Sequence, residues 1–567
     1  MIPRSFDLRC DQCGWREPYQ HPRTTCPQCG HDWLDARYDY AAVRRTWDAE
    51  LPRRPFDMWR YRELLPLRDD AHRLSMGEGG TPLYPTTNLS MMLGRPHIYV
   101  KDERQNPTGS FKDRQASLAI SVMREQGLTE AVVASTGNVA ISYSAYSTRA
   151  GIKLWTFLTS AVPADKMREV ALYGSEVIKV TDTYDETKKV AANFARHRGL
   201  HYDRGLKSIA ARESMKTLAF EVAEQLDELL GPDEQGRPHA VSRGRTTPGG
   251  WRTPDWYFQS VSGGLGPVGV WQGFEELIKM GLVARMPRLA CIQAAGCAPM
   301  VHSFRAGLET AQPVRNPTTL IATVATGDPG AAYTFLRRVI LEHGGAFEMV
   351  SDEEAFRAMH VLAKMDGISM EPAAAIAFAG LFKLVAQEIV KPDDVVVVNC
   401  SGHTFPVEKF LLGDDYARSV EVGPATEAPL SEDGLLASLE RLDRRVRRVV
   451  IIEDHPEAAR LLRRVLQAHG EYQIDEVYDG EAGLALVRES PPDLILLDLM
   501  MPKMDGFTLI EALKAEERLA KIPVIVVTAK DLTPHERQRL DGHVRGLLQK
   551  GTFLSTDLLE DLQELLE

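Results

Sequence analysis

A lysine in a glycine-containing turn is the residue best placed for chemistry in this chain. The stretch NPTGSFKDR at 106–114 contains Lys112, follows a short apolar run at 97–100, and precedes residues 115–123, whose apolar side chains recur at helical spacing. We therefore expect a strand-to-helix turn, where backbone N–H groups and the positive end of a helix could hold an anionic cofactor beside an amine. Taken alone, the stretch is equally compatible with a solvated lysine in an ordinary turn.

Three later turns also follow apolar, strand-like runs and hold small polar residues. STGN at 135–138 offers hydroxyl and amide groups that suit a carboxylate or a ring hydroxyl. SGGLGP at 262–267 has glycines that let backbone N–H groups approach a phosphate. CSGH occupies 400–403. Each of these stretches alone predicts only a turn.

In this order and at these spacings, the four stretches resemble the threonine synthase branch of the fold-type II pyridoxal phosphate (PLP) enzymes, from about residue 7 to 409. The resemblance implies two α/β subdomains with the cofactor between them, and a catalytic Lys112 that carries the cofactor and then moves protons. It further implies cofactor contacts from Asn138, Gly263, Gly264, Leu265, Gly266 and Ser401, and substrate carboxylate contacts from Ser135 and Thr136. Further candidates whose roles stay open are Lys101, Asp102, Phe111, Arg114, Lys166 and Glu371.

Two CxxCG elements near the N-terminus predict a metal site. They supply Cys10, Cys13, Cys26 and Cys29, and two such turns can aim four thiolates at one zinc ion. We expect residues 1–40 to form a zinc ribbon whose folding depends on the metal. The alternatives are a ribbon without metal or a redox pair, with His21 and His31 as possible substitute ligands. The odd total of seven cysteines argues against a disulfide framework.

The region 41–412 alternates strand-like and helix-like stretches, which predicts a doubly wound α/β architecture. Residues 231–252 are rich in Gly, Pro, Arg, Ser and Thr and predict a surface insertion, either a lid or a passive loop. We expect a linker at 413–446 with a short helix at 431–445.

The segment 447–567 has strand-like runs at 449–454, 493–502 and 522–529, so a small parallel sheet is expected. Glu453, Asp454 and Asp498 at the strand ends could hold Mg²⁺, and Thr528 and Lys550 could contact a phosphoryl group. These residues resemble a response-regulator receiver domain, a flavodoxin-like fold. The resemblance implies Asp498 as phosphoacceptor and Asp454 and Asp498 as magnesium ligands.

This second resemblance has two departures. Glu453 stands where aspartate is usual, and Leu547 stands where an aromatic switch residue is common. A receiver retained only for docking is therefore the alternative to one that accepts phosphate.

Composition narrows the class of protein. The chain has 567 residues, 44% of them hydrophobic, and a net charge of −12, which argues against a general nucleic-acid binder. It shows neither a membrane-length apolar run nor a signal segment, so we expect a soluble cytoplasmic protein without membrane contact. The expected partners are a phosphorylated amino-acid substrate, a sensor histidine kinase or phosphotransfer protein, and a second copy in a homodimer.

The leading functional prediction is a PLP-dependent carbon-oxygen lyase that makes L-threonine and phosphate from O-phospho-L-homoserine and water. Regulation of this activity by phosphorylation of the receiver is a further hypothesis. The segments CSGHTFPVEK and SVSGGLGP differ from the threonine synthase pattern, which leaves the nucleophile and the substrate length open. The alternatives are β-replacement on O-phosphoserine, as in cysteate synthase-like enzymes, and deamination of serine or threonine. An amino-acid-sensing signalling protein is the alternative of another class.

Overall fold

The computed structural model describes residues 6–19, 23, 25–230, 251–403 and 418–420, and most of 448–549. Met1–Leu435 and Leu436–Glu567 form two compact units, which are described separately below. The predicted insertion up to position 250, the predicted linker helix at 431–445, His21 and Lys550 lie outside the described residues. Within the described parts of the chain, no helix is both long and apolar enough to cross a membrane.

The N-terminal segment forms a small antiparallel sheet in the order β2-β1-β3. Its strands are β1 (Asp7–Cys10), β2 (Arg16–Pro18) and β3 (Leu34–Arg37). Its own apolar cluster is small and includes Phe6, Leu8 and Leu34, so packing alone buries little surface here.

A five-stranded parallel sheet follows, in the order β14-β8-β7-β6-β9. The strands are β6 (Glu130–Ser135), β7 (Lys153–Thr159), β8 (Glu176–Val180), β9 (His201–Asp203) and β14 (Arg418–Val420). The helices around it are α3 (Lys112–Glu125), α4 (Asn138–Ala150), α5 (Ala164–Leu172) and α6 (Tyr184–Arg198). Leu154 and Leu158 of β7 pack toward α3, α4 and α5, whereas Phe157 contacts Phe194 of α6 on the opposite face. We call this half the small sheet.

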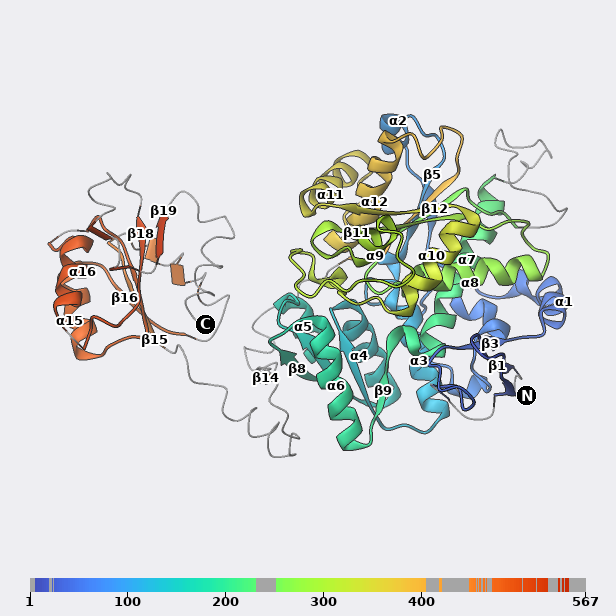
Figure 1. Cartoon of the computed structure of the whole chain (residues 1–567), viewed down its shortest axis with the longest axis horizontal. Coiled ribbons are helices and arrows are strands. Elements are labelled where there is room, and N and C mark those ends of the chain that lie inside the picture. The colour runs from blue at the N-terminus through green and yellow to red at the C-terminus, as the bar shows by residue number, and fades with distance from the viewer. Residues whose placement is uncertain are drawn as a thin grey trace. The chain divides into compact units, whose positions relative to one another are not determined.

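The second half is a six-stranded sheet in the order β12-β11-β10-β13-β5-β4, parallel except for β4. The strands are β4 (Leu83–Pro85), β5 (Ile98–Asp102), β10 (Trp256–Ser260), β11 (Arg288–Ala294), β12 (Gly345–Val350) and β13 (Val396–Cys400). Its longer helices are α1 (Tyr40–Glu50), α7 (Ile209–Leu230), α8 (Leu265–Lys279), α10 (Ala331–His343), α11 (Asp352–Asp366) and α12 (Pro372–Ala386). The short helices are α2 (Asn88–Leu93) and α9 (Pro299–Arg305). The two sheets confirm the expected two-part α/β fold (Figure 1).

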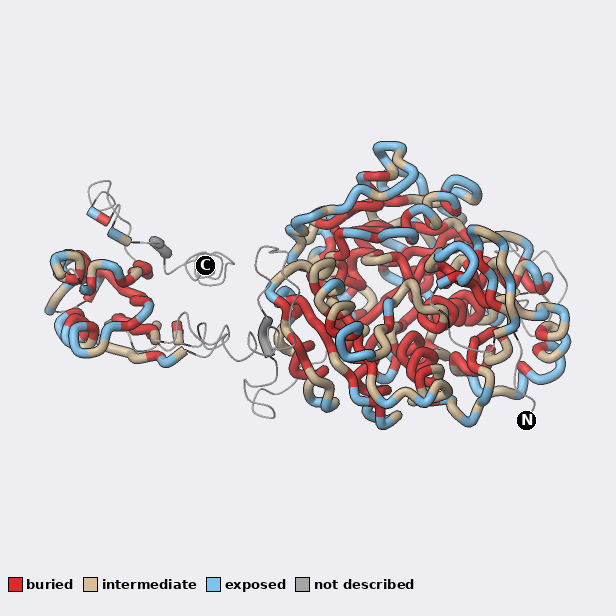
Figure 2. Tube along the Cα trace, turned by 60° about the horizontal axis from the view of Figure 1, so that its bottom comes forward, coloured by how far each residue is buried: buried red, intermediate tan, exposed pale blue. Residues whose placement is uncertain are grey.

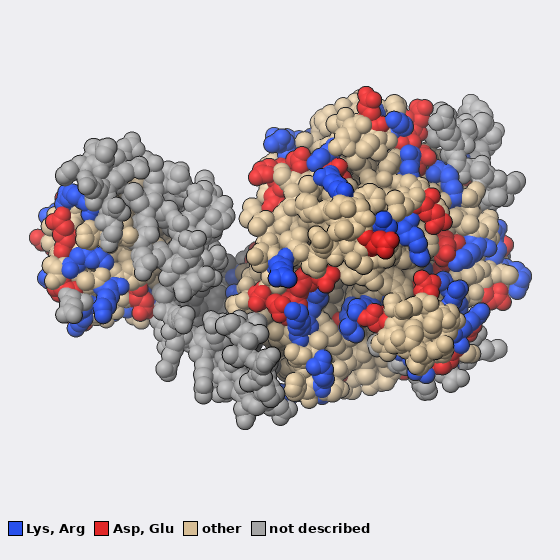
Figure 3. Space-filling view, in the orientation of Figure 1, with Lys and Arg blue, Asp and Glu red and all other residues tan. Residues whose placement is uncertain are grey.

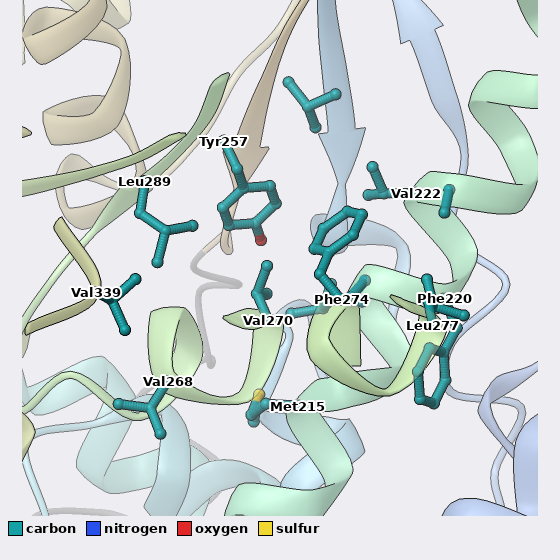
Figure 4. Packing of buried hydrophobic residues seen from close by; sticks show 14 of the residues in the cluster. Met215, Phe220, Val222, Tyr257, Val268, Val270, Phe274, Leu277, Leu289 and Val339 are labelled. Carbon is teal, nitrogen blue, oxygen red and sulfur yellow. The ribbon is translucent and has the colours of Figure 1, made fainter. Parts of the chain in front are cut away.

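Both faces of this large sheet are buried, as the red core of the tube shows (Figure 2). Tyr257 of β10 faces a cluster that includes α7, α8 and α10 (Figure 4), whereas its neighbours Trp256 and Phe258 face α12. Helices α7 and α8 approach so closely that a Cβ on Gly269 would lie 2.2 Å from the Cβ of Met215. The glycine therefore permits the packing that supports the start of α8.

The C-terminal unit has a parallel sheet in the order β16-β15-β17-β18-β19. Its strands are β15 (Arg448–Ile452), β16 (Gln473–Val477), β17 (Leu494–Leu497), β18 (Val524–Thr528) and β19 (Gly546–Gln549), with helices α15 (Gly480–Glu489) and α16 (Gly506–Ala515). This 2-1-3-4-5 order is that of flavodoxin-like sheets, and it confirms the expected fold.

Charged side chains are mixed over the described surface of the first unit. On the face shown in Figure 3, lysines and arginines lie beside aspartates and glutamates, without a continuous basic area on that face.

Candidate active site between the two sheets

The turn that carries Lys112 is held against the turn at 400–403. Phe111 N donates to the carbonyl of Ser401 at 3.1 Å, and His403 N donates to the carbonyl of Gly109 at 2.8 Å. Helix α3 begins at Lys112, as the sequence predicted for a strand-to-helix turn. Lys112 and Ser401, which are almost 300 positions apart in the sequence, thus line the same cavity.

This cavity has a volume of about 100 Å³ and draws its lining from both halves of the unit. The lining includes Phe111, Lys112, Thr136, Asn138, Gln259, Ser262, Gly263, Gly264, Leu265, Gly266, Thr323, Glu371 and Ser401. The structure therefore brings together every predicted cofactor contact and Thr136, one of the two predicted substrate contacts.

The surroundings of the Lys112 amine lower its pKa toward neutral pH. The protein packed around the amine removes water from it, which disfavours the charged form and lowers its pKa to about 8, although Glu371 opposes this effect. Its Nζ lies 4.3 Å from the centroid of the Phe111 ring. A neutral amine is the form that can attack a carbonyl, so the environment favours covalent attachment of an aldehyde.

The glycine loop opens helix α8 and can hold an anion. Gly264 has φ +91°, a conformation that glycine adopts without strain, and a Cβ there would lie 2.7 Å from the Cβ of Ala332. Helix α8 begins at the next residue, Leu265, so N–H groups of its first turn are free of helical partners. A phosphate bound here would gain both these donors and the positive end of the helix.

A buried ion pair joins the two halves beside the predicted ring contact. Lys166 Nζ lies 2.6 Å from Glu371 Oε2, and both side chains are buried. Lys166 also donates to Asn138 Oδ1 at 2.5 Å, and Asn138 Nδ2 donates to Glu371 Oε1 at 2.7 Å. These contacts fix the orientation of the Asn138 amide. The sequence left the roles of Lys166 and Glu371 open, and the structure places both side chains beside Asn138.

The two predicted substrate contacts in STGN have different surroundings. The hydroxyl of Ser135 accepts from Gly137 N at 3.0 Å and Ala140 N at 3.1 Å, so it caps the turn, and Ser135 is not a lining residue of the cavity. Thr136 does line the cavity, and its hydroxyl donates to the carbonyl of Thr323 at 3.0 Å. Substrate contact by either residue stays a prediction, and the geometry favours Thr136.

Three other open candidates lie in buried ion pairs outside the cavity lining. Arg114 bridges Glu103 and Glu221 at 2.7 and 2.6 Å, and Lys101 lies 2.6 Å from the same Glu221. Asp102 pairs with Arg104 at 2.7 Å. These contacts tie β5, α3 and α7 together, so these residues support the Lys112 turn from behind.

The sequence did not point to residues 323–328, which contact both the turn at 135–138 and the residue that precedes the glycine loop. Thr326 Oγ1 lies 2.5 Å from Ser262 Oγ beside the glycine loop, and Thr323 lines the cavity. The surrounding stretch IATVATGDP at 321–329 lacks hydrophobic periodicity, so no local pattern marks the segment.

The N-terminal cysteines have the geometry of a closed metal site. The Sγ atoms of Cys10 and Cys29 are 3.6 Å apart, as are those of Cys13 and Cys26, and all four lie within 4.8 Å of one another. Sulfurs at about 2.3 Å from a tetrahedral zinc ion would be about 3.8 Å apart. The predicted cysteines therefore fit a zinc ion.

In the C-terminal unit, oxygens of Glu453, Asp454 and Asp498 lie within 4.8 Å of one another at the carboxyl ends of β15 and β17. Thr528 is buried at the end of β18. Three carboxylates so close together fit a divalent cation that prefers oxygen ligands. The structure thus gathers the predicted receiver residues apart from Lys550, which lies outside the described part.

The cavity between the sheets likewise fits PLP, because its lining includes an amine of lowered pKa, a glycine loop that can bind an anion, and the buried residue Ser401, whose side chain carries a hydroxyl.

Comparison with known proteins agrees with both sites. The family model of pyridoxal-phosphate dependent enzymes matches residues 74–402, and that of the response regulator receiver domain matches residues 449–563. The chain is 33% identical over 397 residues to the threonine synthase of Methanocaldococcus jannaschii, covering 70% of this chain and 91% of that protein. It is 30% identical to the threonine synthase of Methanosarcina acetivorans, covering 70% of this chain and 91% of that protein. The chain belongs to the family of pyridoxal-phosphate dependent enzymes and carries a response-regulator receiver domain in its C-terminal unit.

Proposed function

We propose that this protein is a lyase that converts O-phospho-L-homoserine and water into L-threonine and phosphate. The observation that carries the proposal is the Lys112 amine, with a pKa of about 8, facing a glycine loop in a chain similar to threonine synthases over 91% of their length. The reaction breaks the Cγ–O bond to phosphate and one C–H bond at Cβ, and it forms a bond from Cβ to the hydroxyl of water. Cγ gains one proton, the second proton of water goes to the released phosphate, and the proton removed from Cα is returned.

PLP, when bound, withdraws electrons from the substrate α-carbon. The chain supplies the remaining functions. Lys112 Nζ takes and returns protons, since a pKa of about 8 leaves about a tenth of the amine neutral at pH 7. The N–H groups of the glycine loop hold the cofactor phosphate, and Asn138, fixed by Lys166 and Glu371, orients the ring.

Ser401 would face the pyridine nitrogen with a neutral hydroxyl in place of a carboxylate. A neutral partner leaves that nitrogen less protonated, which favours elimination and replacement over transamination.

The test is a visible absorption spectrum of the purified protein, titrated with O-phospho-L-homoserine while threonine and phosphate are assayed. The proposal predicts a cofactor band that shifts as threonine and phosphate form in equal amounts. A bound cofactor whose band stays unchanged would reject threonine synthesis and direct the test to O-phosphoserine with sulfite, and to serine and threonine.

We also propose that Asp498 accepts a phosphoryl group from a histidine kinase or phosphotransfer protein, with Mg²⁺ held by Asp454 and Asp498, and that this alters catalysis. The supporting observation is β14, which adds to the edge of the small sheet beside β8 and precedes the receiver in sequence. A change in the segment that leads to the receiver could thereby reach the sheet that carries Thr136 and Asn138.

We further propose that the four N-terminal cysteines bind zinc.

A further inference from the structure

One short segment of the large half, residues 323–328, contacts the active site at two points and helix α6 at a third. Thr323 accepts a hydrogen bond from Thr136 of the small half at 3.0 Å. Thr326 lies 2.5 Å from Ser262, next to the glycine loop. Asp328 N donates to Asp185 Oδ2 at 3.1 Å. The segment thus touches the substrate turn, the phosphate loop and helix α6.

The third contact connects the two halves at a fixed point. Asp185 lies in the first turn of α6, which follows strand β8 of the small sheet, whereas Asp328 lies three residues before the start of α10 of the large half. The Asp185 carboxylate forms an ion pair with Lys188, whose Nζ is 2.5 Å from Oδ1, and the negative charge is favoured at the positive end of α6. The Asp185 carboxylate of the small half therefore accepts a hydrogen bond from the Asp328 amide of the large half, and this bond connects the two halves.

Packing around the segment leaves little room for another path of the chain. A Cβ on Gly327 would lie 2.8 Å from Asp185 Oδ2 and 2.1 Å from the carbonyl oxygen of Val314. A Cβ on Gly137 would lie 3.1 Å from Thr323 Cγ2. The segment is therefore closely packed at Gly327 and at Thr323. Thr326, which contacts Ser262, is buried.

We infer that Asp185 is a positioning residue that latches 323–328 across the two halves and so holds Ser262 and the glycine loop in the shape that binds the cofactor phosphate. Asp185 is not a lining residue of the cavity, so it acts through Asp328 and Thr326. The inference rests on the proposed function in so far as the cavity holds PLP, but it is independent of the amino-acid substrate.

The test compares three variants of the full chain by PLP titration of the apoprotein and by hydrogen exchange at the Asp328 amide. Asp185→Ala removes the acceptor, so we expect PLP affinity to fall about three- to tenfold and the Asp328 amide to exchange faster. Asp185→Asn keeps an acceptor oxygen and should stay within about twofold of wild type. Glu186→Ala, which removes an exposed pairing with Lys189 on the same helical turn, is the matched control and should behave as wild type.

Wild-type affinity and unchanged exchange in Asp185→Ala would overturn the latch. An equal loss of affinity in Asp185→Ala and Glu186→Ala would do the same, because it would indicate general damage to α6. If wild type itself fails to bind PLP, the proposed function fails, while faster exchange at Asp328 in Asp185→Ala alone would still establish the latch.

Discussion

Lys166 of α5 and Glu371, which directly precedes α12, form a buried ion pair at 2.6 Å across the two halves of the catalytic unit. Both groups also hydrogen-bond to the side chain of Asn138. One ion pair thus joins the two sheets and aims a cavity-lining amide, which couples the stability of the fold to the geometry of the site.

This pair should show strong coupling in a double-mutant cycle. Glu371→Leu leaves the Lys166 charge buried without its partner, so the free energy of unfolding should fall by about 3–5 kcal/mol. Lys166→Met with Glu371→Leu should recover most of that loss, because the combined change leaves no lone charge. Thermal unfolding of the full chain measures both effects, and additive losses would contradict the coupling.

The depressed pKa of Lys112 predicts how cofactor attachment depends on pH. Only the neutral amine reacts, so the rate of PLP attachment to apoprotein should rise about tenfold per unit as pH increases toward 8 and then level off. Stopped-flow absorbance gives this profile. Lys112→Ala should abolish covalent attachment, and a plateau reached only near the ordinary lysine pKa of about 10.4 would contradict the desolvation argument.

The backbone at Gly264 should be required for phosphate binding. Gly264→Ala adds a Cβ at a positive φ and 2.7 Å from the Cβ of Ala332, so we expect PLP affinity to fall by about tenfold or more. Gly281→Ala imposes a similar strain at φ +68° with open space around its Cβ, and it serves as the control. Absorbance titration should show near wild-type affinity for Gly281→Ala, and equal losses in both variants would reject a local role for Gly264.

Removal of the metal should unfold the N-terminal ribbon. Its small core depends on the four cysteines, so Cys26→Ser should lose zinc and expose residues 6–37 to protease. Cys291→Ser, at a buried position outside the cluster, should retain one zinc ion per chain. Metal analysis with limited proteolysis checks both, and retained zinc in Cys26→Ser would show that this thiolate is not a ligand.

Phosphorylation of the receiver should change turnover through the segment containing β14. Acetyl phosphate with Mg²⁺ should alter the rate of wild type and leave Asp498→Asn unchanged. Ser419→Pro removes one N–H from β14 and should reduce this response while the receiver is still phosphorylated. Turnover assayed beside phosphoprotein gels separates the two steps. Equal turnover with Asp498 fully modified would reject regulation by phosphorylation.

Local signals predicted the parts of the site that depend on a single turn. Glycines, small polar residues and the strand-like runs before them predicted the turns at Lys112, Asn138 and the glycine loop, and the CxxCG spacing predicted the cysteine turns, whereas the roles of Lys112, Asn138 and the glycine loop came from the resemblance of the stretches to a known family. Each of these features is decided within about ten residues by backbone sterics and helix termini.

The rest was decided by tertiary structure, because it joins residues brought together by strand order. The hydroxyl of Ser135 caps its own turn, and Lys101 and Arg114 share Glu221 behind the Lys112 turn, although their sequence positions suited a ligand equally well. The pairing of Lys166 with Glu371 spans more than 200 positions, and segment 323–328 has no periodic pattern of its own. Such contacts depend on which strand ends meet at one cavity, and that follows from packing the two sheets around it.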